Sequence, residues 1–274
     1  MTKRRIETII VHLLLILLSI TILFPFYTML VMASRTSEEL YRGVYYTFGG
    51  QMGSNIVRVV TGTGFFKGYA NSIVIAVASV VGGSFVTAAY GYGVAKFEFK
   101  CKKIFTWFVL VLLMIPGQVS LIGFVMQMRA WHLTSTLWPL ILSALASPFC
   151  AFFMISFCKS SIPSEVLESA RIDGAGELTI FFRIAFYFIL PALSVIGILQ
   201  FLWSWNNYML PLIICDTPEL RTLPLYIRSL TMEYLDDPAA KCCGVALSTI
   251  PIFILYFIFS KTFISGLAAG AVKG

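Results

Sequence analysis

The strongest constraint on this chain is a set of long apolar runs that carry no charge. Each run is near the length of about 20 residues that a helix needs to cross the hydrocarbon of a bilayer. Backbone amides and carbonyls cannot stay unpaired in lipid, so each run is predicted to form a helix. We expect an all-α integral membrane protein, with one transmembrane domain over residues 1–274. Its six transmembrane helices are predicted at about 9–33, 71–95, 104–127, 136–158, 184–210 and 244–265.

The composition also indicates a lipid solvent. Charged residues make up 12% of the chain, about half the share in a typical soluble domain. The net charge of +7 does not indicate a nucleic-acid partner, because the basic residues lie between and beside the apolar runs. The first run is longer than the core of a signal peptide, which is about 7–15 residues, so we expect an uncleaved anchor.

The basic residues predict the orientation. Lys96, Lys100, Lys102 and Lys103 crowd one short loop between the second and third runs. Cytoplasmic loops are enriched in lysine and arginine. We therefore predict that this loop, both termini and the loop between the fourth and fifth spans face the cytoplasm.

That last loop, residues 159–183, is a polar insert in an apolar chain. Pro163 and Glu165 indicate a helix start, since proline is tolerated in a first turn and an acid there suits the helix dipole. Asp173-Gly174 indicates its end, because glycine readily takes the left-handed conformation of a C-cap. A second helix is predicted to begin near Glu177 and to continue into the fifth span. The short helix either merely connects two spans or docks into a groove on a partner.

The residues of this insert resemble a known motif. Glu168-Ser169-Ala170 followed by Asp173-Gly174-Ala175 is similar to the EAA motif of binding-protein-dependent ABC importer permeases. Further segments, in order along the chain, resemble the carbohydrate-importer branch of that family, the maltose-transporter MalG-like permeases. They are Asn71-Ser72, Ile115-Pro116, Ala146-Ser147-Pro148-Phe149, residues 205–212, Thr222-Leu223-Pro224 and residues 266–274.

The resemblance covers the chain from Asn71 to its end and is weaker before that. Two positions depart from the family pattern. Ser169 stands where alanine is usual, and Ile184-Ala185-Phe186-Tyr187 stands where the family has Ile-x-Leu-Pro.

The resemblance implies a function and a set of partners. It implies that residues 159–183 form a cytoplasmic coupling loop that docks on an ATP-hydrolysing subunit. The partners it implies are a second homologous permease, two ATP-binding subunits, an extracytoplasmic solute-binding protein and a sugar, in the inner membrane of a bacterial or archaeal cell. The docking residues carried over are Glu165, Glu168, Ser169, Ala170, Asp173, Gly174 and Ala175.

The chain itself offers no sign of catalysis or of a cofactor. It has no GxxxxGK[ST] phosphate loop, no grouped catalytic side chains and no metal-ligand spacing. By the predicted boundaries, the six spans hold no Asp, Glu, Lys or Arg away from their ends, so an ion-coupled mechanism lacks the intramembrane charges it needs. A permease subunit of an ATP-driven importer is the leading hypothesis. The alternatives are an ion-coupled carrier or channel that acts without an ATPase, and a membrane scaffold without transport.

The polar groups that reach the membrane are amides and aromatic rings. Amides bind hydroxyls without charge and aromatic faces pack on sugar rings, so this set suits a neutral, polyhydroxylated solute. The other interpretation is hydrogen bonding between helices with an aromatic belt at the outer surface. The candidates for the substrate path are Gln118, Gln200, Trp203, Trp205, Asn206, Asn207 and Tyr208.

Overall fold

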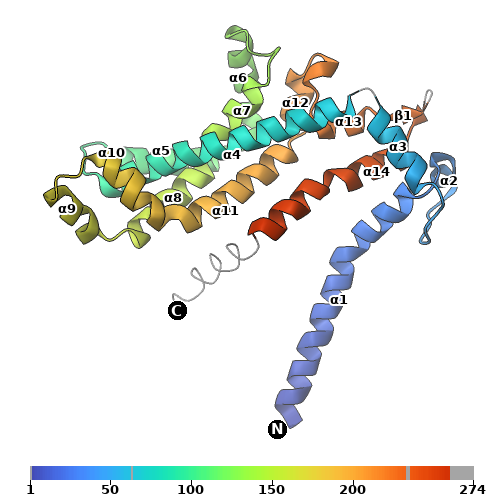
Figure 1. Ribbon diagram of the computed structural model, residues 1–274, viewed down its shortest axis with the longest axis horizontal. Coiled ribbons are helices and arrows are strands. Elements are labelled where there is room, and N and C mark those ends of the chain that lie inside the picture. The colour runs from blue at the N-terminus through green and yellow to red at the C-terminus, as the bar shows by residue number, and fades with distance from the viewer. Residues whose placement is uncertain (1, 63, 233–234, 260–274) are drawn as a thin grey trace. The chain divides into compact units, whose positions relative to one another are not determined.

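The computed structural model describes residues 2–62, 64–232 and 235–259, and these are almost entirely helical (Figure 1). In this part of the chain the only strands are β1 (Thr231–Met232) and β2 (Leu235–Asp236), which form one short antiparallel pair. Five helical stretches are long and apolar enough to cross a membrane, and one bent pair of helices provides a sixth. This confirms the predicted all-α membrane fold.

The helices follow one another with short connections. In chain order they are α1 (Thr2–Ala33), α2 (Ser37–Arg42), α3 (Met52–Thr61), α4 (Phe65–Lys96), α5 (Lys102–Met114), α6 (Gly117–Ala130), α7 (Trp138–Leu145), α8 (Pro148–Ser161), α9 (Ser164–Ile172), α10 (Glu177–Ile180), the π-helix η1 (Phe181–Ala185), α11 (Phe186–Trp205), α12 (Met209–Ile214), the 3₁₀-helix η2 (Pro218–Leu220), α13 (Leu223–Arg228) and α14 (Pro238–Ser248).

The third predicted span, over about 104–127, consists of two helices rather than one. Helices α5 and α6 meet at an angle of 104°. Ile115 and Pro116 lie at the break and both have extended backbone. Proline has no amide hydrogen to donate and disfavours a helical residue before it, so a helix stops there.

The other predicted spans lie in helical stretches whose ends differ from the prediction. The second span is longer, and the fourth, Trp138–Ser161, is interrupted before Pro148, which opens α8. The fifth runs from Glu177 to Trp205 and so ends before the predicted residue 210. The sixth begins earlier, at Pro238. Its predicted end at residue 265 and the segment 266–274 lie outside the described residues.

The chain divides into two compact units. The first unit comprises residues 1–66 and 226–251, and the second comprises residues 67–225 and 252–274.

In the first unit, α14 packs along α1, α2 and α3. Asp237 lies at the start of α14 with its side chain 2% exposed. Its carboxylate accepts hydrogen bonds from Ser37 Oγ of α2 and from the backbone N–H of Ala240, and it pairs with Arg58 Nη1 of α3 at 2.8 Å. One buried carboxylate thus joins three helices.

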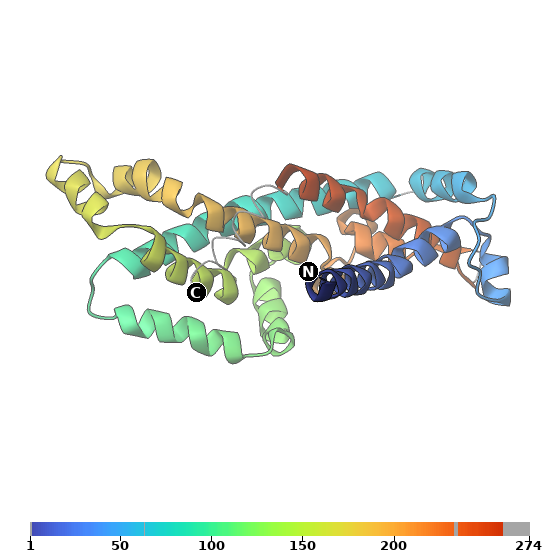
Figure 2. The same cartoon turned by 90° about the horizontal axis from the view of Figure 1, so that it is seen from below.

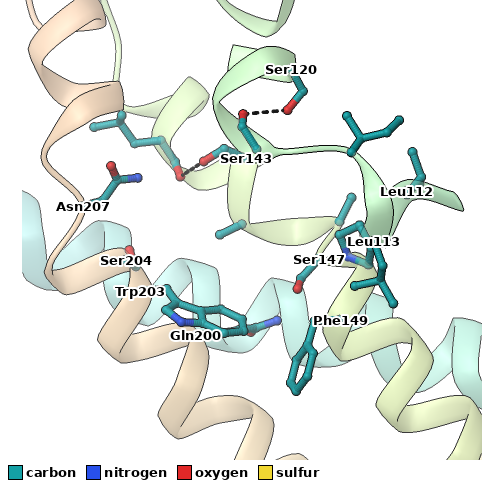
Figure 3. A pocket seen from close by; sticks show the side chains of 16 residues that line it. Leu112, Leu113, Ser120, Ser143, Ser147, Phe149, Gln200, Trp203, Ser204 and Asn207 are labelled. Atoms are coloured by element: carbon teal, nitrogen blue, oxygen red, sulfur yellow. Dashed lines mark hydrogen bonds between the residues drawn. The ribbon is translucent and has the colours of Figure 1, made fainter. Parts of the chain in front are cut away.

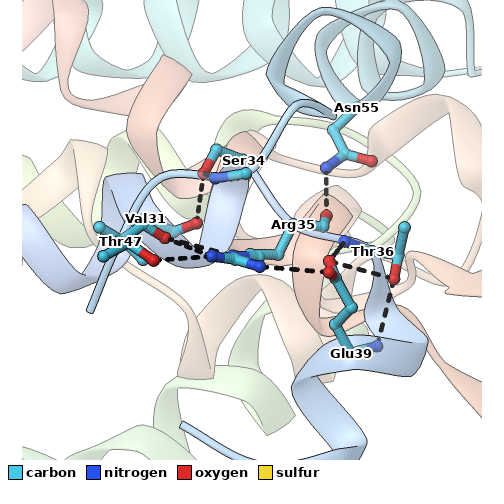
Figure 4. A network of polar contacts seen from close by, with 8 residues as sticks. Val31, Ser34, Arg35, Thr36, Glu39, Thr47 and Asn55 are labelled. Carbon is cyan, nitrogen blue, oxygen red and sulfur yellow. Dashed lines mark hydrogen bonds and ion pairs between the residues drawn. The ribbon is translucent and has the colours of Figure 1, made fainter. Parts of the chain in front are cut away.

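The turn that follows α1 carries a second polar network (Figure 4). Arg35 donates to the backbone oxygen and hydroxyl of Thr47 and to Glu39 at 3.2 Å. Thr36 and Glu39 form a reciprocal capping box at the start of α2, and Asn55 of α3 donates to the Ala33 and Arg35 carbonyls at 2.8 Å. This turn is therefore fixed by side chains from α2 and α3.

In the second unit, α4, α8 and α11 enclose a core that also takes residues from α9 and α10. Glycines let α4 approach closely: a Cβ added at Gly91 would lie 2.3 Å from Met154 Cγ of α8. Both views place α9 at one end of the second unit, beyond the ends of α8 and α11 (Figures 1 and 2). The polar insert therefore projects from the helices that carry the core.

Candidate functional site

Helix α9 forms where the sequence predicts it. It begins at Ser164 after Pro163 and ends at Ile172. Gly174 follows with φ +82°, a left-handed conformation, and its N–H donates to the Arg171 carbonyl at 3.0 Å. Ala175 N–H then reaches back to the Ala170 carbonyl at 2.9 Å. The helix is continuous again from Glu177, as expected.

One face of α9 belongs to the core of the second unit. Leu167 and Ala170 are buried there, and Ala175 packs against the same cluster. Of the seven candidate docking residues, Ala170 and Ala175 therefore face inward and position the loop. Glu165, Glu168, Ser169, Asp173 and Gly174 are exposed.

The outer face of the insert also carries apolar side chains that the sequence did not single out. Ile172 is 85% exposed and Leu178 is 75% exposed. They flank the turn at residues 173–176. Ile172 lies outside the candidate membrane spans, and a large apolar side chain exposed there beside carboxylates is typical of an interaction surface. Ile172 and Leu178 do not share the helical spacing of the buried residues Leu167, Ala170 and Ile180. That difference in spacing could have identified them from the sequence as exposed apolar residues.

The insert is tied down at both of its ends. At the start, Lys96 Nζ of α4 donates to the Ile162 carbonyl at 2.6 Å. At the far end, Arg171 pairs with Glu177 through bonds of 2.7 and 3.3 Å, which close the turn between α9 and α10. The hydrogen bond with Glu177 raises the pKa of Arg171. Hydrogen bonds thus attach the insert to α4 at its start and α9 to α10 at its end.

A groove of about 580 Å³ lies in the same unit, lined by residues of α5 and α6, of α7 and α8, and of α11 and the turn after it (Figure 3). Its lining combines hydroxyls, amides, aromatic rings and aliphatic groups, and no lining residue is charged. The lining residues are Leu112, Leu113, Ile115, Gly117, Ser120, Leu140, Ser143, Ala144, Ala146, Ser147, Pro148, Phe149, Gln200, Trp203, Ser204 and Asn207.

Three of the seven candidate path residues line this groove: Gln200, Trp203 and Asn207. Figure 3 shows them on one wall, on α11 and just after it, with Ser204 between them. They face the wall formed by Ser143, Ser147 and Phe149. The structure therefore brings this part of the predicted set together.

The other four candidates lie elsewhere. Gln118 is exposed and is not part of the lining. Trp205 is 1% exposed and stacks on Phe201 with ring centroids 5.6 Å apart. Asn206 donates back to the Leu202 carbonyl at 2.9 Å, and Tyr208 is half-buried outside the groove.

The groove also contains residues that sequence reasoning missed. Ser120 and Ser143 donate to carbonyls of their own helices at 2.9 Å, and Ser147 caps α8 by accepting from Cys150 N–H. Ser204 lies 3.4 Å from Ser79 of α4. A serine in an apolar helix commonly bonds its own backbone, so its sequence context alone does not mark it as part of a groove.

Gln200 has the most unusual surroundings in this groove. It is 2% exposed, and in the described part of the chain neither Nε2 nor Oε1 has a hydrogen-bond partner of normal geometry. The Cys150 thiol, a weak partner, lies beside it. Gly83 of α4 makes room for the amide, since a Cβ there would lie 2.6 Å from both amide atoms. Buried amides normally find partners, so this one needs an explanation.

No metal site was found among the described residues, where no three His, Cys, Asp or Glu side chains lie together in a group that could hold an ion.

Comparison with known proteins gives a consistent set of relatives. Residues 87–267 match the family model described as binding-protein-dependent transport system inner membrane component. The arabinooligosaccharides transport system permease protein AraQ of Bacillus subtilis is 34% identical, over 94% of this chain and 93% of its own length. The lactose transport system permease protein LacG of Rhizobium radiobacter is 28% identical, over 99% of this chain and 98% of its own.

A solved structure shares the fold. A crystal structure of a bacterial ABC transporter involved in the import of the acidic polysaccharide alginate contains a chain with a TM-score of 0.81 to this one. It is 21% identical, over 94% of this chain and 96% of the other.

Proposed function

Because this chain belongs to the family of binding-protein-dependent transport system inner membrane components, we propose that it is the permease subunit of an ATP-driven importer of a sugar or oligosaccharide. The observation that carries the proposal is α9: a short helix with one face buried in the core at one end of the membrane helices and with an acidic and apolar outer face. The names of the relatives support a sugar as the solute.

The proposed assembly contains this chain, a second related permease, two ATP-binding subunits and an external solute-binding protein. The chain lies in the inner membrane of a bacterial or archaeal cell, with both termini and α9 in the cytoplasm. The density of lysines after α4 supports this orientation. ATP binding and hydrolysis take place on the partner subunits, because this chain has no phosphate loop.

Helix α9 is the proposed contact with an ATP-binding subunit. Ile172 and Leu178 would enter an apolar groove on that subunit, and Glu165, Glu168 and Asp173 would meet basic side chains at its edge. Ser169 and Gly174 are small and leave the partner room to approach. This division of roles follows the usual interface pattern of an apolar centre with a polar rim.

Movement of the ATP-binding subunits would pass through α9 to the membrane helices. Lys96 ties the start of the insert to α4, and Leu167 and Ala170 seat α9 in the core shared with α8 and α11. A rigid connection of this kind moves helices as bodies, which is how a transporter alternates access to a central path. The groove around Gln200 is our candidate for this chain's part of the path.

The experiment that tests this function is purification from native membranes in a mild detergent, with the mass of every retained protein measured. Recovery of a second permease and two copies of an ATPase is the expected result. Ile172→Asp is expected to lose the ATPase from the complex, whereas Ser160→Asp, an exposed position in the last turn of α8, is expected to keep it. A stable homo-oligomer without an ATPase, or sugar uptake driven by an ion gradient without nucleotide, would contradict the proposal.

A further inference from the structure

The connection between α4 and α5 concentrates positive charge where two membrane helices meet. Lys96 is the last residue of α4, Lys102 and Lys103 are the first residues of α5, and Lys100 lies between them. Both helices belong to candidate membrane spans. The lysines are therefore placed at a membrane surface, at the level of the phospholipid headgroups.

Two of these four lysines have partners within the protein. Lys96 Nζ donates to a backbone carbonyl just ahead of α9 at 2.6 Å. Lys102 Nζ pairs at 2.6 Å with Glu98, the one acid of the connection, and neutralises it. Lys100 and Lys103 are exposed, and within the described part of the chain neither forms an ion pair. Two positive charges are therefore left for an anion from outside the protein.

An apolar groove lies beside these lysines, and we call it the α4–α5 groove. Its outer part has a volume of about 400 Å³, and its lining includes Gly93 of α4 with Phe97 and Phe99 of the connection. An inner part of about 200 Å³ continues deeper along the two helices and shares Tyr90 and Phe105 with the outer part. The Tyr90 hydroxyl donates to the Phe105 carbonyl at 2.9 Å, so the lining presents mainly aromatic rings and aliphatic groups.

The length of the groove matches one leaflet of a bilayer. Along α4 the lining begins at Val86, and the helix ends at Lys96. A helix advances about 1.5 Å per residue, so this stretch covers about 15 Å. Half of the hydrocarbon core of a bilayer is also about 15 Å thick. The groove therefore has the length of an acyl chain, with its outer end beside the lysines.

The pairing of charge and groove selects among possible ligands. A free phosphate ion would meet the lysines and leave the apolar groove unfilled. An apolar helix of another protein would fill the groove and leave Lys100 and Lys103 without an anion. A phospholipid with a net negative headgroup satisfies both features, because its phosphate and its acyl chain are parts of one molecule.

We propose that the α4–α5 groove binds one anionic phospholipid. Its acyl chain lies along Tyr90, Gly93 and Phe105, and its phosphate pairs with Lys100 and Lys103. Basic pockets between membrane helices are known to bind the headgroups of acidic lipids. This inference concerns a lipid ligand and is separate from the proposed transport function, so its tests require neither a solute nor ATP.

The first test is photochemical labelling in a bilayer. The protein, with the partners that it retains on purification, is placed in vesicles of phosphatidylcholine. The vesicles contain a trace of phosphatidylglycerol or phosphatidylcholine that carries a diazirine on one acyl chain. Labelled peptides are identified by mass spectrometry. Since each lysine near an acidic headgroup contributes about a fivefold preference, residues 86–108 should be labelled about tenfold or more in favour of phosphatidylglycerol. Equal labelling by both lipids, or no labelling of residues 86–108, would overturn the inference.

The second test removes the two free charges. Lys100→Gln combined with Lys103→Gln leaves the apolar lining intact, and labelling by the phosphatidylglycerol probe should fall to the level of the phosphatidylcholine probe. Lys159→Gln is the matched control, because Lys159 is an exposed lysine in the last turn of α8 and lies outside the groove. Its labelling should be that of the original protein. Undiminished labelling of the double variant would contradict the proposal.

The third test fills the groove and keeps every lysine. It also covers the case in which the double variant inserts in the wrong orientation, since lysines influence membrane topology. Gly93 lines the groove, and nothing lies within 4 Å of the position of an added Cβ. Leucine is a better helix former than glycine, so Gly93→Leu should fold and exclude the acyl chain. Gly123→Leu in α6, also with open space around its Cβ position, should leave labelling unchanged. Normal labelling of Gly93→Leu would show that the groove does not hold the lipid.

Discussion

Substitution of Gly174 tests whether the shape of the insert couples ATP use to transport. Gly174 has φ +82°, and nothing lies within 4 Å of the position that a Cβ would take. Alanine therefore meets no steric obstacle, and its cost is the left-handed backbone alone, about 1–2 kcal/mol. Asparagine tolerates this conformation better, so Gly174→Asn is expected to cost less.

Proline at this position is expected to prevent the turn. Its ring holds φ near −65°, far from the observed +82°. It also removes the N–H that donates to the Arg171 carbonyl at 3.0 Å. We expect Gly174→Pro to insert into the membrane and to lose coupling.

The assay is the number of sugar molecules taken up per ATP hydrolysed by the complex in vesicles. A cost of 1–2 kcal/mol lowers the population of the formed turn relative to other conformations by about 5- to 30-fold. Coupling should therefore fall in the order glycine, asparagine, alanine, proline. Gly176→Ala is the matched control, because Gly176 has φ −70° and equally open space. Equal losses for Gly174→Ala and Gly176→Ala, or normal coupling in Gly174→Pro, would refute the reasoning.

Three further predictions concern other contacts of the two units. Lys96→Met removes a charged hydrogen bond of 2.6 Å, worth about 1.5–3 kcal/mol, and should lower the sugar-to-ATP ratio while Lys100→Met does not. Glu177→Gln weakens an ion pair whose side chains are 38% and 45% exposed; such pairs contribute less than about 1 kcal/mol, so the melting temperature should change by no more than a few degrees. Burial raises the pKa of Asp237, but its hydrogen bonds outweigh this and the net pKa is lowered. Its stabilisation is thus present above the ordinary aspartate pKa and is lost as pH falls through the lowered value. Asp237→Asn should destabilise the protein by about 1–3 kcal/mol at neutral pH and flatten the acid part of a melting-temperature curve, and an unchanged curve would contradict this assignment.

The sequence predicts the helices well because length and lack of charge are sufficient to identify a span. The limits of α9 are also predictable, because Pro163 favours a helix start and Gly174 favours the left-handed turn that ends it. Both effects depend only on residues next to them in the sequence. The break at Pro116 could have been predicted from the sequence, because a proline inside a helix removes a backbone hydrogen bond and kinks or ends the helix. Hydropathy alone marks the length of a span and carries no information on a change of its direction.

The site was less predictable because burial depends on contacts between segments far apart in the chain. Among the candidate docking residues, Ala170 and Ala175 are small like Ser169 and Gly174, yet only the two alanines face the core. Trp203 and Trp205 are two residues apart on one helix, and one lines the groove while the other stacks on Phe201. No local pattern separates the members of these pairs.

The π-helix between α10 and α11 connects the two candidate sites. The residues that α11 and its preceding turns bury in the core are Ile180, Phe181, Ala185, Ile189, Ala192 and Ile196, and Gln200 continues the same row into the groove. Beyond Ala185 these positions repeat every three or four residues, the period of one α-helical face. The step from Ile180 to Ala185 is five residues, and the wider turn of η1, closed by a bond from Phe186 N–H to the Phe181 carbonyl, absorbs the extra residue. Without it, Ile180 and the insert would be rotated by about 100° relative to α11. The π-turn keeps Ile180 and Gln200 on one helical face. In the proposed importer, a movement imposed on α9 would therefore reach the groove through α10 and α11.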